Sequence, residues 1–495
     1  MTETVKCDLR INGGLLLNTD TARLETGDVA IKGDQIIAIE NVPDNYIADR
    51  VIDATGLVVT PGIIDIHTHV AGSLRRSSPY VEDMMQNADT AGVHSGVTTV
   101  LDAGSCGIAN IGGLVNHVIP NAKTRVLALL NVGSLGVNRV PEVTSALDIE
   151  HDAAVASIQS RKDVIVGVKV RMVSPGIATF KSDSHLPPQA MGATTRHSHP
   201  SRGRFRGGSQ ELPDLALAAK AMANDAGVRL MVHMGDTTGQ SDEAAAAAPR
   251  ILAELLTDGD IVTHSFTGAR GGLIGDNQEL LREAIDARQR GVKFDIGVGG
   301  GNFSFDAAKR VLDGGLIPDT ISSDVTLTSR YAGTAFSQMD SIGKVMSLGI
   351  GLEDALVMST RKPAAVLGAK LPPQAQSLSL SEGRHSLSLS LSEGRDLPSL
   401  PLSGGDSEGV PNDRAIERML GCMAPGTHAD LTLLRVHEGE WEFIDAAGNI
   451  NIGPYALEPV SCIRAGQVMP IDYGPREGGW LPNRSTSPVG GRGLG

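Results

Sequence analysis

Eight short apolar segments, each of strand length, recur through the first three-quarters of the 495-residue chain. Most are rich in valine, isoleucine and leucine and are bounded by glycine or polar residues, which is typical of buried strands. The segments cover residues 63–69, 98–102, 126–131, 164–171, 229–233, 261–264, 292–296 and 320–324. Helix-like stretches lie between them, and two of these end just before a glycine, which is typical of helix C-termini: 215–225 and 279–290. This alternation predicts an α/β fold, a closed parallel (β/α)8 TIM barrel.

The regions before and after the eight segments have β character of their own. Residues 7–17 and 27–39 read as short strands interrupted by glycine turns, and residues 425–434 have the same character. We therefore expect the two ends of the chain to combine into one small domain that packs against the barrel. The predicted domains are a β-sandwich made of residues 1–60 and 419–473 and a barrel spanning residues 61–370.

Three segments do not fit this plan. Residues 175–211 interrupt the connection after the fourth strand with many serine, glycine, proline and arginine residues and with no helical or strand period. Residues 371–418 contain an imperfect tandem repeat, 377–384 and 388–395, which is typical of a low-complexity linker. The tail, residues 474–495, is rich in proline, glycine and serine and is expected to be flexible.

Two histidines lie at the end of the first apolar segment. His67 and His69 are two residues apart, so on a strand their rings face the same side and can bind one cation. A His-x-His pair alone is weak support for a metal site. A second pair, His197 and His199, lies in the 175–211 insertion, where nothing holds strand geometry, and we interpret it as a solvated loop pair.

A lysine within the fourth apolar segment strengthens the metal-site prediction. Alternating valines occupy one face of this segment, which turns Lys169 and Arg171 toward the interior. Burial disfavours the charged amine and lowers its pKa, so the neutral amine can take up carbon dioxide as a carbamate. The two carbamate oxygens could bridge two divalent metals. The alternative is an edge-strand lysine that reaches solvent.

Three further donors lie at the ends of later segments, where the active sites of parallel barrels form. They are His233, His264 and Asp324. With the earlier residues they complete six predicted ligands of a two-metal hydrolytic centre: His67, His69, Lys169, His233, His264 and Asp324. Zinc is the expected metal, because imidazole and carboxylate donors without a thiolate suit it.

This set of motifs resembles the amidohydrolase superfamily and, within it, the amidohydrolase/deacetylase (dihydroorotase-like) family of metallohydrolases. The resemblance covers most of residues 8–368 and a short return from 421 to about 471. It rests on Asp65-x-His67-x-His69, Gly167-Val-Lys169-Val-Arg171, the two later histidines and the Pro318 to Asp324 motif. It implies a barrel with a small β-sandwich, a binuclear zinc centre with carboxylated Lys169, and hydrolysis of an amide or ester bond in a small N-acyl or O-acyl compound.

The ligand set gives each residue a predicted role. The more buried metal would be held by His67, His69 and Asp324, the second by His233 and His264, and carboxylated Lys169 would bridge the two. Two cations about 3.5–4 Å apart would share a water and lower its pKa, so that a metal-bridging hydroxide attacks the acyl carbonyl. Asp324 would be the catalytic residue, accepting the proton of this hydroxide and passing it to the leaving group.

Two more residues on these strands are assigned supporting roles. Asp65 faces the same side as His67 and would orient an imidazole from the second shell of the metal site. The alternative for Asp65 is a salt bridge beneath the barrel. Arg171, two residues beyond Lys169 on the same face, is the candidate for binding a substrate anion, and the alternative is a structural ion pair.

The substrate is the least determined part of the prediction. In dihydroorotases an arginine two positions after the second histidine binds the substrate carboxylate, but here that position is Ala71. Deacetylases of the family usually carry histidines where this chain has Val298 and Thr326, so its substrate pocket must differ. Three functions compete: a zinc-dependent deacetylase, a cyclic amidase similar to dihydroorotase or hydantoinase, and a non-catalytic barrel subunit. Retention of all six ligands argues against the last.

Composition limits the remaining possibilities. The formal net charge of −14, without a basic patch, argues against nucleic acid as a partner and leaves a small-molecule acyl substrate, with homo-oligomerisation open. The cysteines show no paired spacing, so neither a disulfide framework nor a cysteine zinc site is expected: Cys7, Cys106, Cys422 and Cys462. No run resembles a signal peptide or a membrane span, so we expect a cytoplasmic protein without a membrane partner.

Overall fold

The computed structural model describes residues 3–71, 87–173, 212–239, 241–332, 334–368 and 420–485. The 175–211 insertion with His197 and His199, the 371–418 linker, and the last ten residues of the predicted tail lie outside these described ranges. Within the described ranges, no helix combines the length and the apolarity needed to cross a membrane.

Seven of the eight predicted strands are present and form one curled parallel sheet. They are β6 (Ile63–Thr68), β7 (Val97–Ala103), β8 (Arg125–Asn131), β9 (Ile165–Arg171), β10 (Arg229–His233), β11 (Ile261–Thr263) and β12 (Lys293–Phe294). The strands are hydrogen-bonded in sequence order from β6 to β12, each parallel to its neighbour. The strand β6 ends just before His69 and the strand β11 just before His264, so both histidines lie at the carboxyl edge of the sheet.

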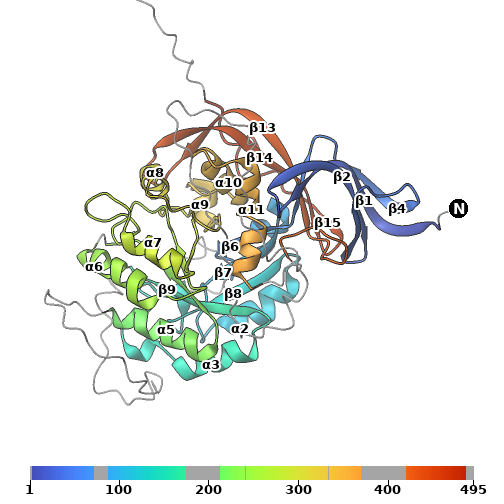
Figure 1. Cartoon of the computed structure of the whole chain (residues 1–495). Helices are drawn as coiled ribbons and strands as arrows, with labels where there is room; N and C mark the ends of the chain where they lie inside the picture. The colour runs from blue at the N-terminus through green and yellow to red at the C-terminus, as the bar shows by residue number, and fades with distance from the viewer. Residues whose placement is uncertain are drawn as a thin grey trace, which may run out of the picture.

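Helices alternate with these strands in the chain and continue after β12. They are α1 (Ala88–Ala91), α2 (Ile111–Gly113), α3 (His151–Ser160), α5 (Asp214–Ala226), α6 (Asp242–Arg250), α7 (Arg282–Gln289), α8 (Phe305–Asp313), α9 (Leu327–Ala332), α10 (Gln338–Met346), α11 (Leu352–Val357) and α12 (Arg361–Val366). Of these, α3, α5, α6 and α7 lie on one side of the molecule (Figure 1). Short 3-10 and π turns occur at η2 (Val93–Ser95), η3 (Leu114–Val118), η4 (Ile119–Asn121), η5 (Gly136–Asn138), η6 (Ala146–Asp148) and η8 (Ile251–Leu255).

The helix α5 illustrates why these segments are helical. Its buried residues recur at helical spacing, and the helix packs against β9 and β10: Leu215, Ala216, Ala219, Met222, Ala223 and Ala226. It ends at Gly227, whose φ of 65° is the left-handed conformation that glycine adopts without a steric penalty. Periodicity and the terminal glycine therefore predicted this helix to within one residue at each end.

The eighth predicted strand, residues 320–324, is a correction to the sequence analysis. The segment is not a regular strand and pairs through isolated bridges, one from Asp295 to Thr320 and one from Thr68 to Val325. Asp324 has a φ of 47°, outside the range of extended backbone, so the strand conformation cannot continue through it. Backbone hydrogen bonds still link the segment to both sides, from Ile296 N to Thr320 O at 3.0 Å and from Asp324 N to His67 O at 2.7 Å.

The two ends of the chain do combine, but in one hydrogen-bonded sheet rather than in a sandwich of two separate sheets. Its strands are β1 (Val5–Asn18), β2 (Arg23–Lys32), β3 (Gln35–Glu40), β4 (Tyr46–Asp53), β5 (Val58–Pro61), β13 (Leu431–Ile444), β14 (Ile450–Arg464) and β15 (Gln467–Met469). The junction is the antiparallel pairing of β5 with β13, and β1 pairs in parallel with both β4 and β5. The long β1 bridges β2, β4 and β5, which joins all strands into one sheet.

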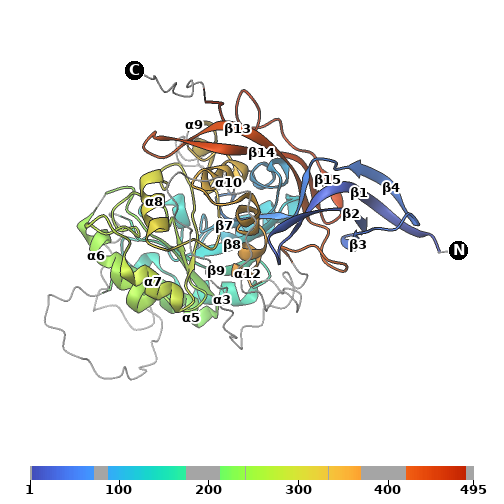
Figure 2. The same cartoon turned by 45° about the horizontal axis from the view of Figure 1, so that its top comes forward.

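The first part of the predicted flexible tail packs against the body of the protein. Trp480 is only 5% exposed, and its indole donates a hydrogen bond to the carbonyl of Asp472. Arg476 forms an ion pair with the buried Asp340 of α10. Residues 474–485 therefore lie against α10 and β13, because a buried indole and a buried carboxylate bind them there. In Figure 2 the β13–β14 hairpin extends over α9 and α10 on this side of the molecule.

Candidate metal centre

The carboxyl edge of the parallel sheet brings three of the predicted ligands into one group. His67 on β6, His69 just after β6, and Asp324 in the eighth segment each place one ligand atom within 4.8 Å of the others. Asp324 Oδ1 lies 3.5 Å from His67 Nε2 and 3.3 Å from His69 Nε2. Two imidazole nitrogens and a carboxylate oxygen directed at one point suit a divalent transition metal.

The rings of the other two predicted histidines lie beside this group. The ring centroids of His233 and His264 lie 4.1 Å apart, and those of His67 and His264 lie 4.9 Å apart. His264 is fixed by its Nδ1, which lies 2.7 Å from the carbonyl oxygen of Gly297. Its other ring nitrogen, Nε2, is buried and has no hydrogen-bond partner among the described residues. A buried, unpartnered imidazole nitrogen beside three other donors is what a ligand to a metal requires.

Lys169 completes the group from β9. Its side chain is 1% exposed, with Nζ 3.2 Å from His67 Nε2 and 3.3 Å from Met231 Sδ. No carboxylate of the described residues forms an ion pair with it. Burial is therefore the dominant effect and lowers the pKa of Lys169 from 10.5 to about 7. The amine is thus available in its neutral, nucleophilic form near neutral pH.

Burial also keeps three of the predicted imidazole ligands neutral, which is the form that binds metals. It lowers the pKa of His67 and of His233 well below the usual value and that of His264 to about 3. For Asp324, burial raises the pKa, but the neighbouring His67 and His69 outweigh burial and hold it below its usual range. Neutral imidazoles and an ionised carboxylate are ready to act as ligands without first losing a proton.

Two of the predicted ligands have unusual backbone conformations. His264 and Asp324 have φ values of 67° and 47°, in the left-handed region that residues other than glycine rarely adopt. Such a conformation costs about 1–3 kcal/mol, so it persists only where the surrounding structure enforces it, often at functional sites. Gly299 shows how closely this site is packed, because a Cβ there would lie 2.3 Å from Asp324 Oδ2.

A hydrogen-bonded relay that the sequence analysis did not identify positions His67. Its Nδ1 lies 2.9 Å from Thr263 Oγ1, and this hydroxyl donates to Asp295 Oδ2 at 2.7 Å. Asp295 is fully buried and also accepts hydrogen bonds from the hydroxyls of Thr320 and Ser322. An indirect carboxylate contact of this kind fixes ring orientation and basicity. The available signal was the position of Asp295 at the end of the seventh predicted strand, on the edge that carries the ligands.

Two further polar residues near the ligands were also missed. Ser105 Oγ lies 2.8 Å from His69 Nδ1, and Asn302 donates from Nδ2 to Asp324 Oδ2 at 3.1 Å. Both come from loops that follow strands, whose contacts do not follow from periodicity. Each of the three grouped ligands, His67, His69 and Asp324, therefore has a hydrogen-bond partner outside the group that holds its orientation.

The two supporting residues have contacts that differ from their first predicted roles. Asp65 forms no hydrogen bond or ion pair with an imidazole of the described residues and instead accepts hydrogen bonds from the backbone N–H of His67 and from the N–H and hydroxyl of Ser323. It thereby links β6 to the eighth segment, and burial raises its pKa to about 7. Arg171 forms an ion pair with Glu142 at 2.9 Å, which is the alternative that the sequence left open.

The fold and this group together define a class of protein: a parallel α/β enzyme whose buried imidazole and carboxylate donors meet at the carboxyl edge of its sheet. The amidohydrolase family model matches residues 58–371, so the chain belongs to the amidohydrolase family and is a hydrolase of carbon–nitrogen bonds. A deacetylase from Agrobacterium fabrum is 30% identical over 346 residues, covering 69% of this chain and 73% of its own length. A deacetylase from Enterococcus faecalis is 26% identical over 351 residues, covering 71% and 83%.

Solved structures share the fold over nearly the whole chain. An adenine deaminase matches with a TM-score of 0.68 and 23% identity, covering 94% of this chain and 100% of its own. A dihydroorotase matches with a TM-score of 0.67 and 22% identity, covering 94% of this chain and 99% of its own. At these identities the likeness supports the fold and not the substrate.

Proposed function

We propose that this chain is a binuclear zinc-dependent deacetylase that hydrolyses an amide or ester bond in a small N-acyl or O-acyl compound. The observation that carries the proposal is the buried group of His67, His69 and Asp324, with the unpartnered Nε2 of His264 beside it. The similarity to deacetylases over about seven-tenths of the chain supports the acyl substrate. We also propose that residues 320–325 close the seven-stranded sheet into a barrel, supported by their bridges to both sides.

The residues present fit the metal ions that the family uses. His67, His69 and Asp324 would hold one ion, and His233 and His264 a second. Lys169, buried and without an ion pair to any carboxylate of the described residues, would be carboxylated and shared by both. Bound metal ions would supply an activated water and polarise the acyl carbonyl.

The chain's own residues then have distinct tasks. Asp324 is ionised, and its Oδ1 faces the ligand group, so it can accept a proton from the attacking water and release it to the leaving nitrogen or oxygen. Asn302 holds the second carboxylate oxygen and so limits rotation of Asp324. The relay through Thr263 and Asp295 fixes the His67 ring so that its Nε2 faces the ligand group.

The surroundings of Arg171 favour a substrate with a neutral polar group. Its guanidinium is already paired with the buried Glu142, so the positive charge that it presents to a substrate is partly neutralised. A free carboxylate on the substrate would have to compete with Glu142 for the guanidinium. Ala71, buried next to the histidine pair, offers no charge at the position where dihydroorotases carry an arginine. We therefore favour an uncharged acyl compound over a cyclic amide that carries a carboxylate, such as dihydroorotate.

Metal analysis combined with a substrate panel tests this proposal. Purified full-length protein should contain close to two zinc ions per chain and hydrolyse N-acetyl or O-acetyl compounds in preference to dihydroorotate and hydantoin. Removing the metal with a chelator should abolish hydrolysis, and adding zinc should restore it. Protein grown with zinc that contains no transition metal would overturn the proposal. Preferred hydrolysis of dihydroorotate or hydantoin would support the cyclic amidase instead.

A further inference from the structure

A cavity with both apolar and charged residues in its wall lies between α10, β13 and the segment 474–485. It has a volume of about 440 Å³, and none of the predicted metal ligands lines it. This volume falls in the range of small-molecule sites. The cavity is lined by charged residues of α10 and the segment and by the apolar Trp441, Ile444 and Leu481.

A buried lysine, Lys344, is one of the residues that line this cavity. Lys344 is 1% exposed, and its Nζ lies 3.1 Å from Asp340 Oδ2 in an ion pair. This atom also lies 5.9 Å from the centre of the Phe303 ring and makes no other polar contact with the described residues, so at least one of its three N–H groups lacks an acceptor. A buried cation with unused donors is costly unless another acceptor reaches it. The cavity is where that acceptor can enter, because Lys344 lines it.

Cations outnumber anions at the buried end of the cavity. Asp340 is shared between Lys344 and Arg476, so one carboxylate serves two cations. The guanidinium of Arg476 also lies 3.7 Å from the ring of Phe336, which fixes it at this end. Arg484 is a third cation of the lining, stacked over Trp441 at 4.9 Å and without an ion pair among the described residues.

The rest of the lining limits the kind of anion. Glu442 and Glu477 also line the cavity and are more exposed than Asp340, so they would repel a compound that carries several negative charges. The apolar residues of the wall suit a hydrocarbon body. We propose that this cavity binds a small organic compound with one carboxylate, held by Lys344 and Arg484, and an apolar body against Trp441 and Ile444.

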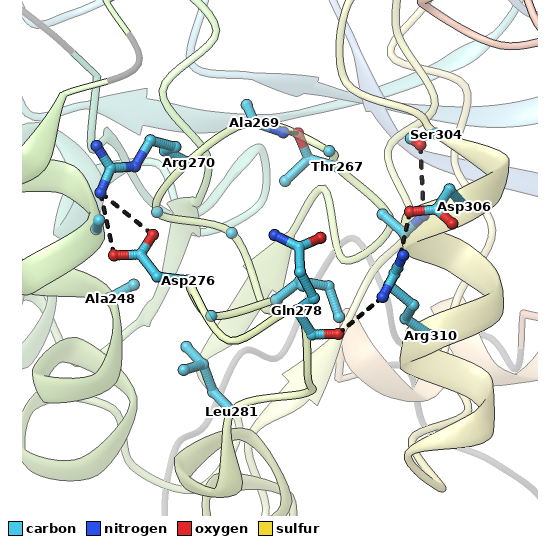
Figure 3. Close-up of a pocket in the computed structure, with 17 residues that line it drawn as sticks. Ala248, Thr267, Ala269, Arg270, Asp276, Gln278, Leu281, Ser304, Asp306 and Arg310 are labelled. Atoms are coloured by element: carbon cyan, nitrogen blue, oxygen red, sulfur yellow. Dashed lines mark hydrogen bonds and ion pairs between the residues drawn. The ribbon is translucent and has the colours of Figure 1, made fainter.

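The cavity shown in Figure 3 provides a matched contrast within the same protein. It has a volume of about 270 Å³, and its charged residues are already paired with opposite charges. Arg270 pairs with Asp276, and Arg310 pairs with Asp306 at 2.7 Å. Arg310 also donates to the carbonyl of Gln278 at 3.1 Å. Substituting Arg310 therefore removes a partly exposed cation that is already paired with a carboxylate, at a different cavity.

Binding of hexanoate and its neutral analogue hexanamide tests the proposal. Titration calorimetry on the full-length, metal-loaded protein should show saturable binding of hexanoate and much weaker binding of hexanamide. Arg484→Ala should weaken hexanoate binding about tenfold, the value of one charge-assisted hydrogen bond. Lys344→Met should weaken it further. Hydrolysis of the acyl substrate should be unchanged in Arg484→Ala, because this residue is outside the metal centre.

The controls separate this cavity from the metal centre and from general effects of charge. Arg310→Ala should bind hexanoate as the unmodified protein does. Arg484 is exposed, so its replacement keeps the test valid even if Lys344→Met does not fold. Equal hexanoate affinity in the unmodified protein and in Arg484→Ala would overturn the proposal. Equal binding of hexanoate and hexanamide would overturn it too, and so would the absence of any saturable binding of hexanoate.

Discussion

Two lysines of this protein are equally buried and have opposite surroundings. Lys169 and Lys344 are each 1% exposed. Lys169 faces an imidazole nitrogen and a thioether, whereas Lys344 faces the carboxylate of Asp340. Burial lowers the pKa of both; Asp340 opposes this effect through an ion pair at Lys344, whereas Asp324 and Asp295 oppose it at Lys169 without an ion pair. The comparison teaches that the neighbour, and not burial alone, decides whether a lysine becomes a reactive amine or remains a structural cation.

The largest expected effect comes from replacing Lys169, the lysine that has no ion pair with a carboxylate of the described residues. Lys169→Ala should lower acyl hydrolysis by orders of magnitude and remove one of the two proposed metal ions, because the proposed bridge is removed. Added short carboxylic acids should restore part of the activity by replacing the carbamate oxygens. Metal content and hydrolysis rates measure both effects.

The matched control is Lys169→Arg, which should also fail, because a guanidinium stays protonated and cannot be carboxylated. Lys344→Arg keeps a cation beside Asp340 and should hydrolyse the substrate normally. If Lys169→Ala retains two metals and full activity, the carbamate hypothesis is falsified.

The next largest effect should come from replacing Asp340, the carboxylate that forms an ion pair with Lys344. Asp340→Ala should lower the free energy of unfolding by about 3–5 kcal/mol, because it leaves Lys344 and Arg476 as uncompensated charges in a buried place. Thermal unfolding of the full chain measures this loss. Asp306→Ala, which removes an exposed ion pair on α8, should change the free energy by less than about 1 kcal/mol. Equal losses in the two variants would contradict the comparison.

A smaller effect should follow from loosening the relay behind His67. Thr263→Val removes the hydroxyl that joins His67 to Asp295 while keeping the shape of the side chain. Metal affinity should fall about 10-fold to 100-fold, the usual effect of losing a partner behind a metal ligand. Competition with a chelator measures this affinity. Thr267→Val alters a hydroxyl in a neighbouring loop and should leave metal affinity unchanged.

The smallest effect concerns acid stability. Although burial raises the pKa of Asp340, Lys344 and Arg476 lower it more, so the folded-state pKa lies below the usual value. Ionised Asp340 therefore stabilises the folded protein fully above the pKa of about 4 that this carboxyl has in the unfolded chain. This stabilisation is lost as the pH falls through the pKa of Asp340 in the folded protein. As the pH is lowered below about 4, the free energy of unfolding should fall less steeply in Asp340→Asn than in the unmodified protein. An identical slope would show that Asp340 does not titrate differently on folding.

The parts of the structure that depend on local pattern were predictable. Alternation along β9 predicted that Lys169 turns inward, and the carboxyl ends of the strands predicted that His67 and His69 approach Asp324. The terminal glycine of α5 predicted where that helix ends. These features depend on a few consecutive residues, so their physical causes are visible in the sequence.

The missed features depend on partners that are distant in sequence. The sequence left an ion pair open for Arg171 but did not identify its partner Glu142, which lies 29 residues earlier in a loop. The eighth segment gives up regular strand conformation where Ser323 bonds to Asp65, 258 residues away. Trp480 is buried although its surroundings in the sequence are typical of a flexible tail. Composition and periodicity carry no information about such contacts, because each needs the folded arrangement of other elements.

The single sheet built from both chain ends has a consequence for biosynthesis. Thr60 of β5 and Thr432 of β13 meet across 372 residues of chain. Because synthesis runs from the N-terminus, β5 leaves the ribosome long before its neighbour exists, and its edge stays open until the last strands are made. An open edge invites pairing with other chains. A product that terminates before residue 431 should therefore aggregate through β5, even though it contains all six proposed metal ligands.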